Sequence, residues 1–209
     1  MPPSEQTLEI DSASADPFGS YYDPSPPVNL SRPLVVCSFF GFGGSVIAKR
    51  IAALGGWPHI DVYEQTAHKL GEHKAVPHLG TENPAWSIAE ERVIQRALTR
   101  RPCPVIGLSD GHQPTDHISD LIKRQARLVV IKGDWLEAQA LLLDEIAEAP
   151  ERLPEFADRP IPDLHSLQLL YRDREALYRQ AEVTIDAAKL GPGVAAQCVV
   201  RGLGLEASG

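Results

Sequence analysis

The sequence predicts a three-layer α/β fold, in which a parallel sheet of five strands is flanked by helices on both faces. Short apolar runs, typical of buried strands, alternate along the chain with longer segments of helical periodicity. This alternation favours a parallel sheet, because neighbouring parallel strands are joined by crossover helices. The 209 residues and the hydrophobic content of 43% suffice for one such domain with a sizeable core.

The elements follow from these patterns in chain order. The run Leu34-Val35-Val36-Cys37 is typical of a buried strand, and the segment SVIAKRIAAL that starts at Ser45 is typical of an amphipathic helix. Strands are predicted near residues 34–39, 59–62, 105–108, 128–131 and 183–185. Helices are predicted over residues 44–54, 62–70, 84–99, 116–125, 134–147, 164–180 and 194–201.

The first 33 residues differ in composition from the rest of the chain. They are rich in Pro, Ser and Asp and poor in aliphatic residues, so they bury too little apolar surface to offset the entropy lost on ordering. We therefore expect a disordered tail over residues 1–33 and one folded domain over residues 34–209. The aromatic cluster at residues 17–22 is either a docking peptide or, as its composition favours, part of an idle tail.

Charge, hydropathy and cysteine content argue against several classes of function. The net charge of −8 disfavours broad nucleic-acid binding, which needs a basic surface. No stretch reaches the roughly 18 apolar residues of a membrane span, and the N-terminus lacks a basic start followed by an apolar run. We expect a cytoplasmic protein without a membrane partner. The odd number of cysteines, in apolar stretches at Cys37, Cys103 and Cys198, predicts buried free thiols.

A glycine-rich segment, Ser38-Phe39-Phe40-Gly41-Phe42-Gly43-Gly44-Ser45, joins the first strand to the first helix. In the P-loop pattern G-x-x-x-x-G-K-[ST], backbone N–H groups surround a phosphate, the lysine neutralises it and the hydroxyl holds Mg²⁺. Here Ser38 stands at the first glycine and Gly44 replaces the lysine. The segment is therefore a degenerate P-loop, whose backbone at Gly41, Gly43, Gly44 and Ser45 is still expected to attract anions. We expect its phenylalanines to fill the cleft in part.

Two further motifs carry a resemblance to a known family. The spacing from Ser45 to Asp61, with Trp57-Pro58-His59-Ile60-Asp61 at its end, resembles the shikimate kinases. The segment Arg174-Glu175-Ala176-Leu177-Tyr178 resembles a second motif of this family, near the last strand. The matches extend, with gaps, from residue 34 to the C-terminus. The resemblance implies a P-loop kinase fold, with ATP and Mg²⁺ as cofactors and an alcohol as the phosphate acceptor.

The resemblance also assigns roles to individual residues. It places Ser45 and Asp61 near Mg²⁺, and it makes Arg159 a catalytic arginine of a mobile lid at about residues 149–162. Arg174 corresponds to the arginine that grips the substrate carboxylate. The substrate site that the resemblance implies consists of Asp61, Asp110, Gly111 and Arg174.

Three substrate contacts of the family are changed in this chain. Tyr63 replaces an aspartate, Ser87 replaces an arginine, and Ser109-Asp110-Gly111 replaces a triple-glycine loop. These departures argue against shikimate as the ligand. His112 and His117 flank the altered loop and are further candidates for ligand contact, because loops that follow parallel strands carry sites in this fold type.

The assigned roles have structural alternatives. Asp61 is also placed to cap the next helix, and Asp110 lies in a Ser-Asp-Gly sequence typical of a turn, which we favour for this residue. Arg159 is equally consistent with an exposed loop. Lys49 and Arg50 lie more than a helical turn beyond the missing lysine, so we expect them on the solvated face of the helix.

Three functions remain in view. We favour a pseudokinase that binds a phosphate-bearing ligand, a nucleotide or a protein partner, with binding of ATP and Mg²⁺ weak or absent. The alternative is an active ATP-dependent small-molecule kinase that has a remodelled P-loop and a substrate other than shikimate. The third is a structural subunit whose Phe-rich loop is buried in an interface.

Overall fold

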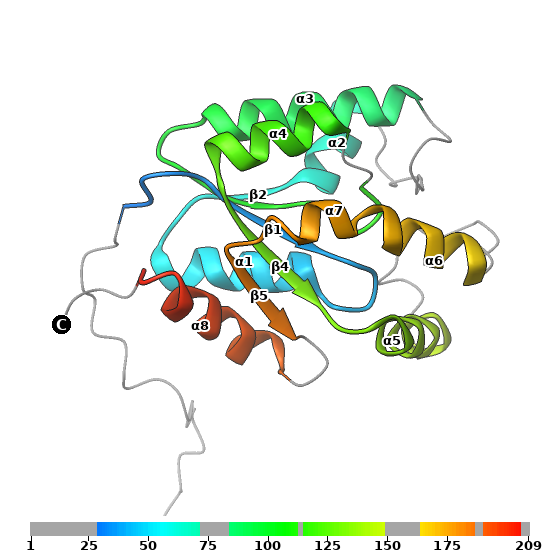
Figure 1. Cartoon of the computed structure of the whole chain (residues 1–209). Helices are drawn as coiled ribbons and strands as arrows, with labels where there is room; N and C mark the ends of the chain where they lie inside the picture. Colours follow the sequence, from blue (N-terminus) through cyan, green and yellow to red (C-terminus); the bar gives the residue numbers. More distant parts are fainter. Residues whose placement is uncertain (1–28, 72–83, 113–114, 149–163, 187–189, 206–209) are drawn as a thin grey trace, which may run out of the picture.

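The computed structural model describes residues 29–71, 84–112, 115–148, 164–186 and 190–205. These residues contain a five-stranded sheet in the order β2-β3-β1-β4-β5, and every neighbouring pair is parallel (Figure 1). The strands are β1 (Leu34–Ser38), β2 (His59–Asp61), β3 (Val105–Gly107), β4 (Arg127–Lys132) and β5 (Val183–Asp186). The predicted fold class is confirmed.

Helices connect the strands at nearly the predicted positions. They are α1 (Gly44–Gly55), α2 (Val62–Leu70), α3 (Pro84–Thr99), α4 (Asp116–Gln125), α5 (Trp135–Glu148), α6 (Leu164–Asp173), α7 (Glu175–Tyr178) and α8 (Pro192–Gly202). α1 and α8 pack together on one side of the sheet, while α3 and α4 lie on the other (Figure 1).

One predicted helix is divided in two. The sequence predicts a single helix over residues 164–180, but α6 ends at Asp173 and α7 begins at Glu175. Arg174 lies between them, and only 1% of its surface is exposed. Because its guanidinium donates a hydrogen bond to the end of β1, a tertiary contact holds the chain at this break.

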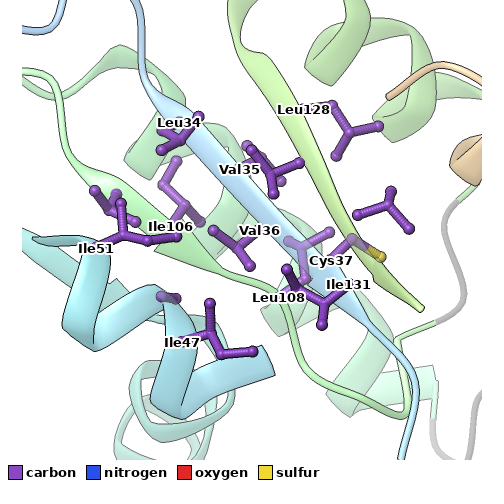
Figure 2. Packing of buried hydrophobic residues seen from close by; sticks show 14 of the residues in the cluster. Leu34, Val35, Val36, Cys37, Ile47, Ile51, Ile106, Leu108, Leu128 and Ile131 are labelled. Atoms are coloured by element: carbon purple, nitrogen blue, oxygen red, sulfur yellow. The ribbon is translucent and has the colours of Figure 1, made fainter. Parts of the chain in front are cut away.

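The central strand β1 organises the core. All five of its residues are buried, and it is paired with β3 on one side and β4 on the other. Figure 2 shows its side chains packed against Ile47 and Ile51 of α1 and against Ile106, Leu128 and Ile131 of the neighbouring strands. The loop that follows β1 therefore lies at the centre of the carboxyl edge of the sheet, where parallel α/β folds bind their ligands.

Some predictions fall outside the described residues. These are the tail before residue 29 and the proposed lid, including Arg159. Cys37 and Cys103 are buried free thiols as predicted, whereas Cys198 is only partly buried. Among the described residues, no helix combines the length and the apolar character needed to cross a membrane.

Candidate functional site

The degenerate P-loop has the backbone of a strand-to-helix turn. Gly41 and Gly43 adopt left-handed conformations, with φ of 81° and 65°, and Gly43 immediately precedes α1. A side chain at Gly41 would also come within 2.9 Å of the Leu141 Cβ, so the loop lies directly against α5. At Gly43, in contrast, a Cβ would meet no atom within 4 Å. Glycine is thus needed at position 41 for both conformation and space.

The phenylalanines of the loop belong to the protein core. Phe39, Phe40 and Phe42 are each at most 4% exposed. The ring of Phe39 packs edge-on against Phe40 and Tyr171, with ring centroids 5.1 and 5.2 Å apart. All three rings therefore pack into the core, and the expectation that they fill the cleft in part stays a prediction.

The two substitutions in the P-loop pattern contact each other. A Cβ built on Gly44 would lie 2.5 Å from the Ser38 Cβ and would overlap the Ser38 hydroxyl oxygen. The Ser38 hydroxyl donates a hydrogen bond to Asp110 Oδ1, which would itself be 3.6 Å from a Cβ at position 44. The side chain of Ser38 thus occupies the space through which a lysine at position 44 would leave the helix.

The predicted metal-binding pair lies together. The Ser45 hydroxyl donates to Asp61 Oδ2 at 2.5 Å. The other carboxylate oxygen of Asp61 accepts the Glu64 backbone N–H at 3.0 Å, which caps α2. The structural role proposed for Asp61 is therefore confirmed, and its contact with Ser45 leaves the metal-binding role as a prediction. Lys49 and Arg50 are exposed on α1, as expected.

Arg174 lies beneath the loop. Its Nη1 donates to the Ser38 backbone carbonyl at 3.0 Å, and its guanidinium lies 5.4 Å from the centre of the Phe39 ring. Nε and Nη2 are buried without a hydrogen-bond partner among the described residues. The Tyr178 hydroxyl donates to the same carbonyl at 3.4 Å. Arg174 therefore fixes the end of β1, and its predicted role as a substrate ligand remains untested.

Burial also affects the thiol that precedes the loop. It raises the pKa of Cys37 to about 12, although the nearby charge of Arg174 acts in the opposite direction. The thiol is therefore protonated at neutral pH and lacks the thiolate needed for nucleophilic attack. Cys37 is a packing residue at the end of the central strand (Figure 2).

A buried polar network lies next to these residues, at the end of β3. His112 Nδ1 donates to Glu90 Oε2 at 2.6 Å, and the Ser109 hydroxyl donates to Glu90 Oε1 at 2.5 Å. Burial alone would raise the pKa of Glu90, but the charge and hydrogen bond of His112, the Ser109 hydroxyl and the charge of Arg174 together hold it below its ordinary value. His112 Nε2 is buried and has no hydrogen-bond partner in the described part of the chain.

Glu90→Gln is expected to lower the free energy of unfolding at pH 7 by about 2 kcal/mol, because the amide cannot accept both charge-assisted hydrogen bonds. The folded-state pKa of Glu90 lies below its ordinary value of 4.5. The stability that ionised Glu90 contributes is therefore fully present above pH 4.5, and it is lost as the pH falls through the folded-state pKa. Urea unfolding at pH 7 and below pH 4.5 measures both effects. An equal loss of stability on acidification in wild type and variant would contradict the prediction, and the adjacent, partly exposed Glu91→Gln is the control.

The structure groups the predicted residues into two sets. Ser38, Gly44, Asp110 and Arg174 lie around the end of β1, and Ser45 contacts Asp61. Asp110 and Gly111 do lie in a turn, as favoured, but the Asp110 carboxylate also reaches the loop. Sequence reasoning missed the pairing of Glu90 with His112, although it did name His112, beside the altered loop, as a candidate for ligand contact.

A separate cavity of about 800 Å³ lies beside the predicted site, between the ends of β4 and β5 and helices α5 and α6. Trp135 and Tyr171 line it together with several charged side chains. None of the predicted site residues lines this cavity, and the acidic groups Asp134 and Glu137 are engaged in capping α5 through each other's backbone N–H. We therefore assign no function to it.

Known proteins that are similar to this chain in sequence are shikimate kinases. No family model matches the sequence. A shikimate kinase of Rhodopseudomonas palustris is 29% identical over 160 residues, which cover 74% of this chain and 72% of that protein. A shikimate kinase of Bartonella henselae is 26% identical over 172 residues, which cover 82% of this chain and 78% of that protein.

Solved structures give the same answer for the fold. A shikimate kinase from Acinetobacter baumannii in complex with shikimate has a TM-score of 0.67 at 18% identity, covering 85% of this chain and 96% of that chain. A gluconokinase from Sinorhizobium meliloti has a TM-score of 0.54 at 16% identity, covering 83% and 91%. The sheet topology and these structures show that the chain has the fold of the P-loop kinases, and in sequence it is similar to the shikimate kinases.

Proposed function

We propose that this chain is a pseudokinase, which has the fold of a P-loop kinase and binds a phosphate-bearing ligand, a nucleotide or a partner without transferring phosphate. The packing of Ser38 against Gly44 is the observation that carries the proposal. Residue 44 has no space for a lysine while residue 38 bears a side chain. The absence of a lysine at position 44 is thus coupled to the serine at position 38, because the two side chains would occupy the same space.

The charge at the loop supports the same proposal. Asp110 Oδ1 accepts the Ser38 hydroxyl and lies close to the start of α1. A helix N-terminus attracts anions through its free N–H groups and its dipole, but a carboxylate beside it repels an incoming phosphate. Phosphoryl transfer instead needs positive charge around the transferring group. Position 44 therefore has neither the cation nor the electrostatic surroundings for this chemistry.

The altered substrate contacts argue against shikimate as the ligand. The ring of Tyr63 packs against Trp86, with centroids 5.3 Å apart, where the resemblance would place a carboxylate. Ser87 replaces the family arginine. The guanidinium of Arg174 is enclosed by Phe39 and the backbone of Ser38, so no group in solvent reaches it in this conformation.

A second candidate is an active kinase with a remodelled loop and a different alcohol substrate. The observation in its favour is the contact between Ser45 and Asp61 at 2.5 Å. Two adjacent oxygen ligands suit Mg²⁺, which is bound in kinases by one or two such groups together with phosphates and water. ATP and Mg²⁺ are the cofactors this candidate requires. The electrostatics at Asp110 are the reason we place it second.

Calorimetric titration with ATP and ADP, with and without Mg²⁺, tests the proposal. We expect no Mg²⁺-dependent nucleotide binding with a Kd below about 1 mM, because the loop lacks its cation and contains a carboxylate. Titration with inorganic phosphate is the control for simple anion binding. Mg²⁺-dependent ATP binding tighter than about 100 μM, which corresponds to roughly 5.5 kcal/mol, would favour the second candidate, and transfer of phosphate from ATP to an alcohol would contradict the pseudokinase.

A further inference from the structure

A second pocket lies at the edge strand β2, and none of the residues that line it belongs to the P-loop. It has a volume of about 340 Å³ and lies between α2 and α3, which Figure 1 shows side by side. The residues that line it include His59 and Ile60 of β2 and the basic side chains Lys69, Arg96 and Arg100. No carboxylate is among the residues that line it. β3 lies between β2 and β1 in the sheet, and the last residue of β2, Asp61, contacts Ser45 but does not line this pocket.

The arginines of the pocket come from α3 and the turn that follows it. Arg92, Arg96 and Arg100 are spaced four residues apart, so they lie in a row along the helix and its last turn. The Arg100 backbone N–H donates to the Ala97 carbonyl at 3.2 Å, which continues this turn beyond Thr99. Like charges at this spacing destabilise a helix. The row is therefore unfavourable unless an anion neutralises it.

Within the described residues, no acidic side chain is paired with these cations. Among the residues that the structure describes, Lys69, Arg92, Arg96 and Arg100 form no ion pair, although the whole chain has 28 acidic and only 20 basic residues. Three other arginines do form ion pairs, namely Arg124, Arg127 and Arg179, and Arg124 is paired with Asp120 at 3.8 Å.

The cations also repel one another. Partial desolvation, followed by the positive charges of Arg96 and Arg92, lowers the pKa of Lys69. A bound anion would relieve this repulsion, since it would favour the charged form of each basic group.

We propose that this pocket binds a small molecule carrying a phosphate or pyrophosphate group. Guanidinium groups bind phosphate oxygens in bidentate pairs, and the lysine ammonium adds a point charge. The volume lies at the lower end of the range for small-ligand pockets, which suits a compact ligand. The net charge of −8 opposes binding of a long polyanion such as a nucleic acid.

Calorimetric titration of the full chain with sodium pyrophosphate at low salt tests this site. We expect wild type to bind with a Kd below about 1 mM, and Arg96→Gln/Arg100→Gln to bind at least tenfold more weakly. Both arginines are exposed, and their replacement removes repulsion, so the double variant should fold normally. Arg124→Gln, which alters an exposed and paired arginine on α4, should bind as wild type does.

The position of binding is measured independently by amide chemical shifts. Pyrophosphate should shift amides of α2 and α3 around Lys69 and Arg96, and leave those of Gly43 and Gly44 unchanged. Unchanged affinity in the double variant, shifts confined to the P-loop, or no binding to wild type at 10 mM would each overturn the proposal. Binding of nucleic acid without binding of pyrophosphate would also overturn the proposal. Lys69→Gln, with an expected loss of at least threefold, provides a second test should the double variant not fold.

Discussion

Gly44→Lys is expected to lower the free energy of unfolding by about 1–3 kcal/mol, and Ser38→Gly in the same chain is expected to restore most of that loss. The single variant forces a Cβ into the Ser38 side chain, whose own Cβ would be 2.5 Å away. Removing the Ser38 side chain clears this space. The two substitutions should therefore be strongly coupled, although Ser38→Gly alone loses the hydrogen bond to Asp110.

Urea unfolding of the wild type, both single variants and the double variant measures this coupling. Val46→Lys, two residues along α1 and about half exposed, is the control and should change stability by less than about 0.5 kcal/mol. If Gly44→Lys is as stable as wild type, Ser38 does not exclude a lysine and the main argument for a pseudokinase fails. Titration of the double variant with Mg²⁺ and ATP should show at least a tenfold gain in affinity over wild type.

Arg174→Ala is expected to cost about 3–5 kcal/mol of stability, which places it among the most damaging single substitutions in the described part of the chain. It removes the hydrogen bond to the Ser38 carbonyl, the contact with Phe39 and the positive charge that helps to stabilise ionised Glu90. It also leaves a cavity beneath the loop. Arg179→Ala, at an exposed arginine paired with Glu175 within one helix, should cost less than about 0.5 kcal/mol.

Arg174→Met separates packing from charge. Methionine retains much of the apolar volume, so this variant should lose about 1–3 kcal/mol, mainly for the lost hydrogen bond from Arg174 to the Ser38 carbonyl. Equilibrium urea unfolding with matched m-values gives the comparison. A methionine variant as unstable as the alanine variant would mean that the guanidinium charge, rather than its packing, holds this region together.

The fold was predictable because its signals are local. The continuous apolar run of β1 and the periodicity of α1 are visible within a few residues, and both appear where predicted. The break at Arg174 was not predictable, because it depends on a carbonyl contributed by Ser38, far away in sequence.

In the candidate site, too, the features that depend on neighbouring residues in the sequence could be predicted, and those that depend on the fold could not. The missing lysine is readable from the sequence, but the pairing of Ser38 with Asp110 requires β1 and β3 to be adjacent. The spacing of Arg92, Arg96 and Arg100 is also visible in the sequence. That no described acid pairs with them emerges only once the neighbouring helices are placed.

The central position of β1 has a consequence for synthesis of the protein. Leu34 pairs with Val105 on one side and with Arg127 on the other, so the first strand has no partner until β3 has been made and lacks its second partner until β4 has followed. At translation rates of about 5–20 residues per second, the apolar segment from Leu34 to Phe40 waits on the order of 5–20 s before the sheet can close around it. During that interval it is the part of the nascent chain most exposed to aggregation and to capture by chaperones.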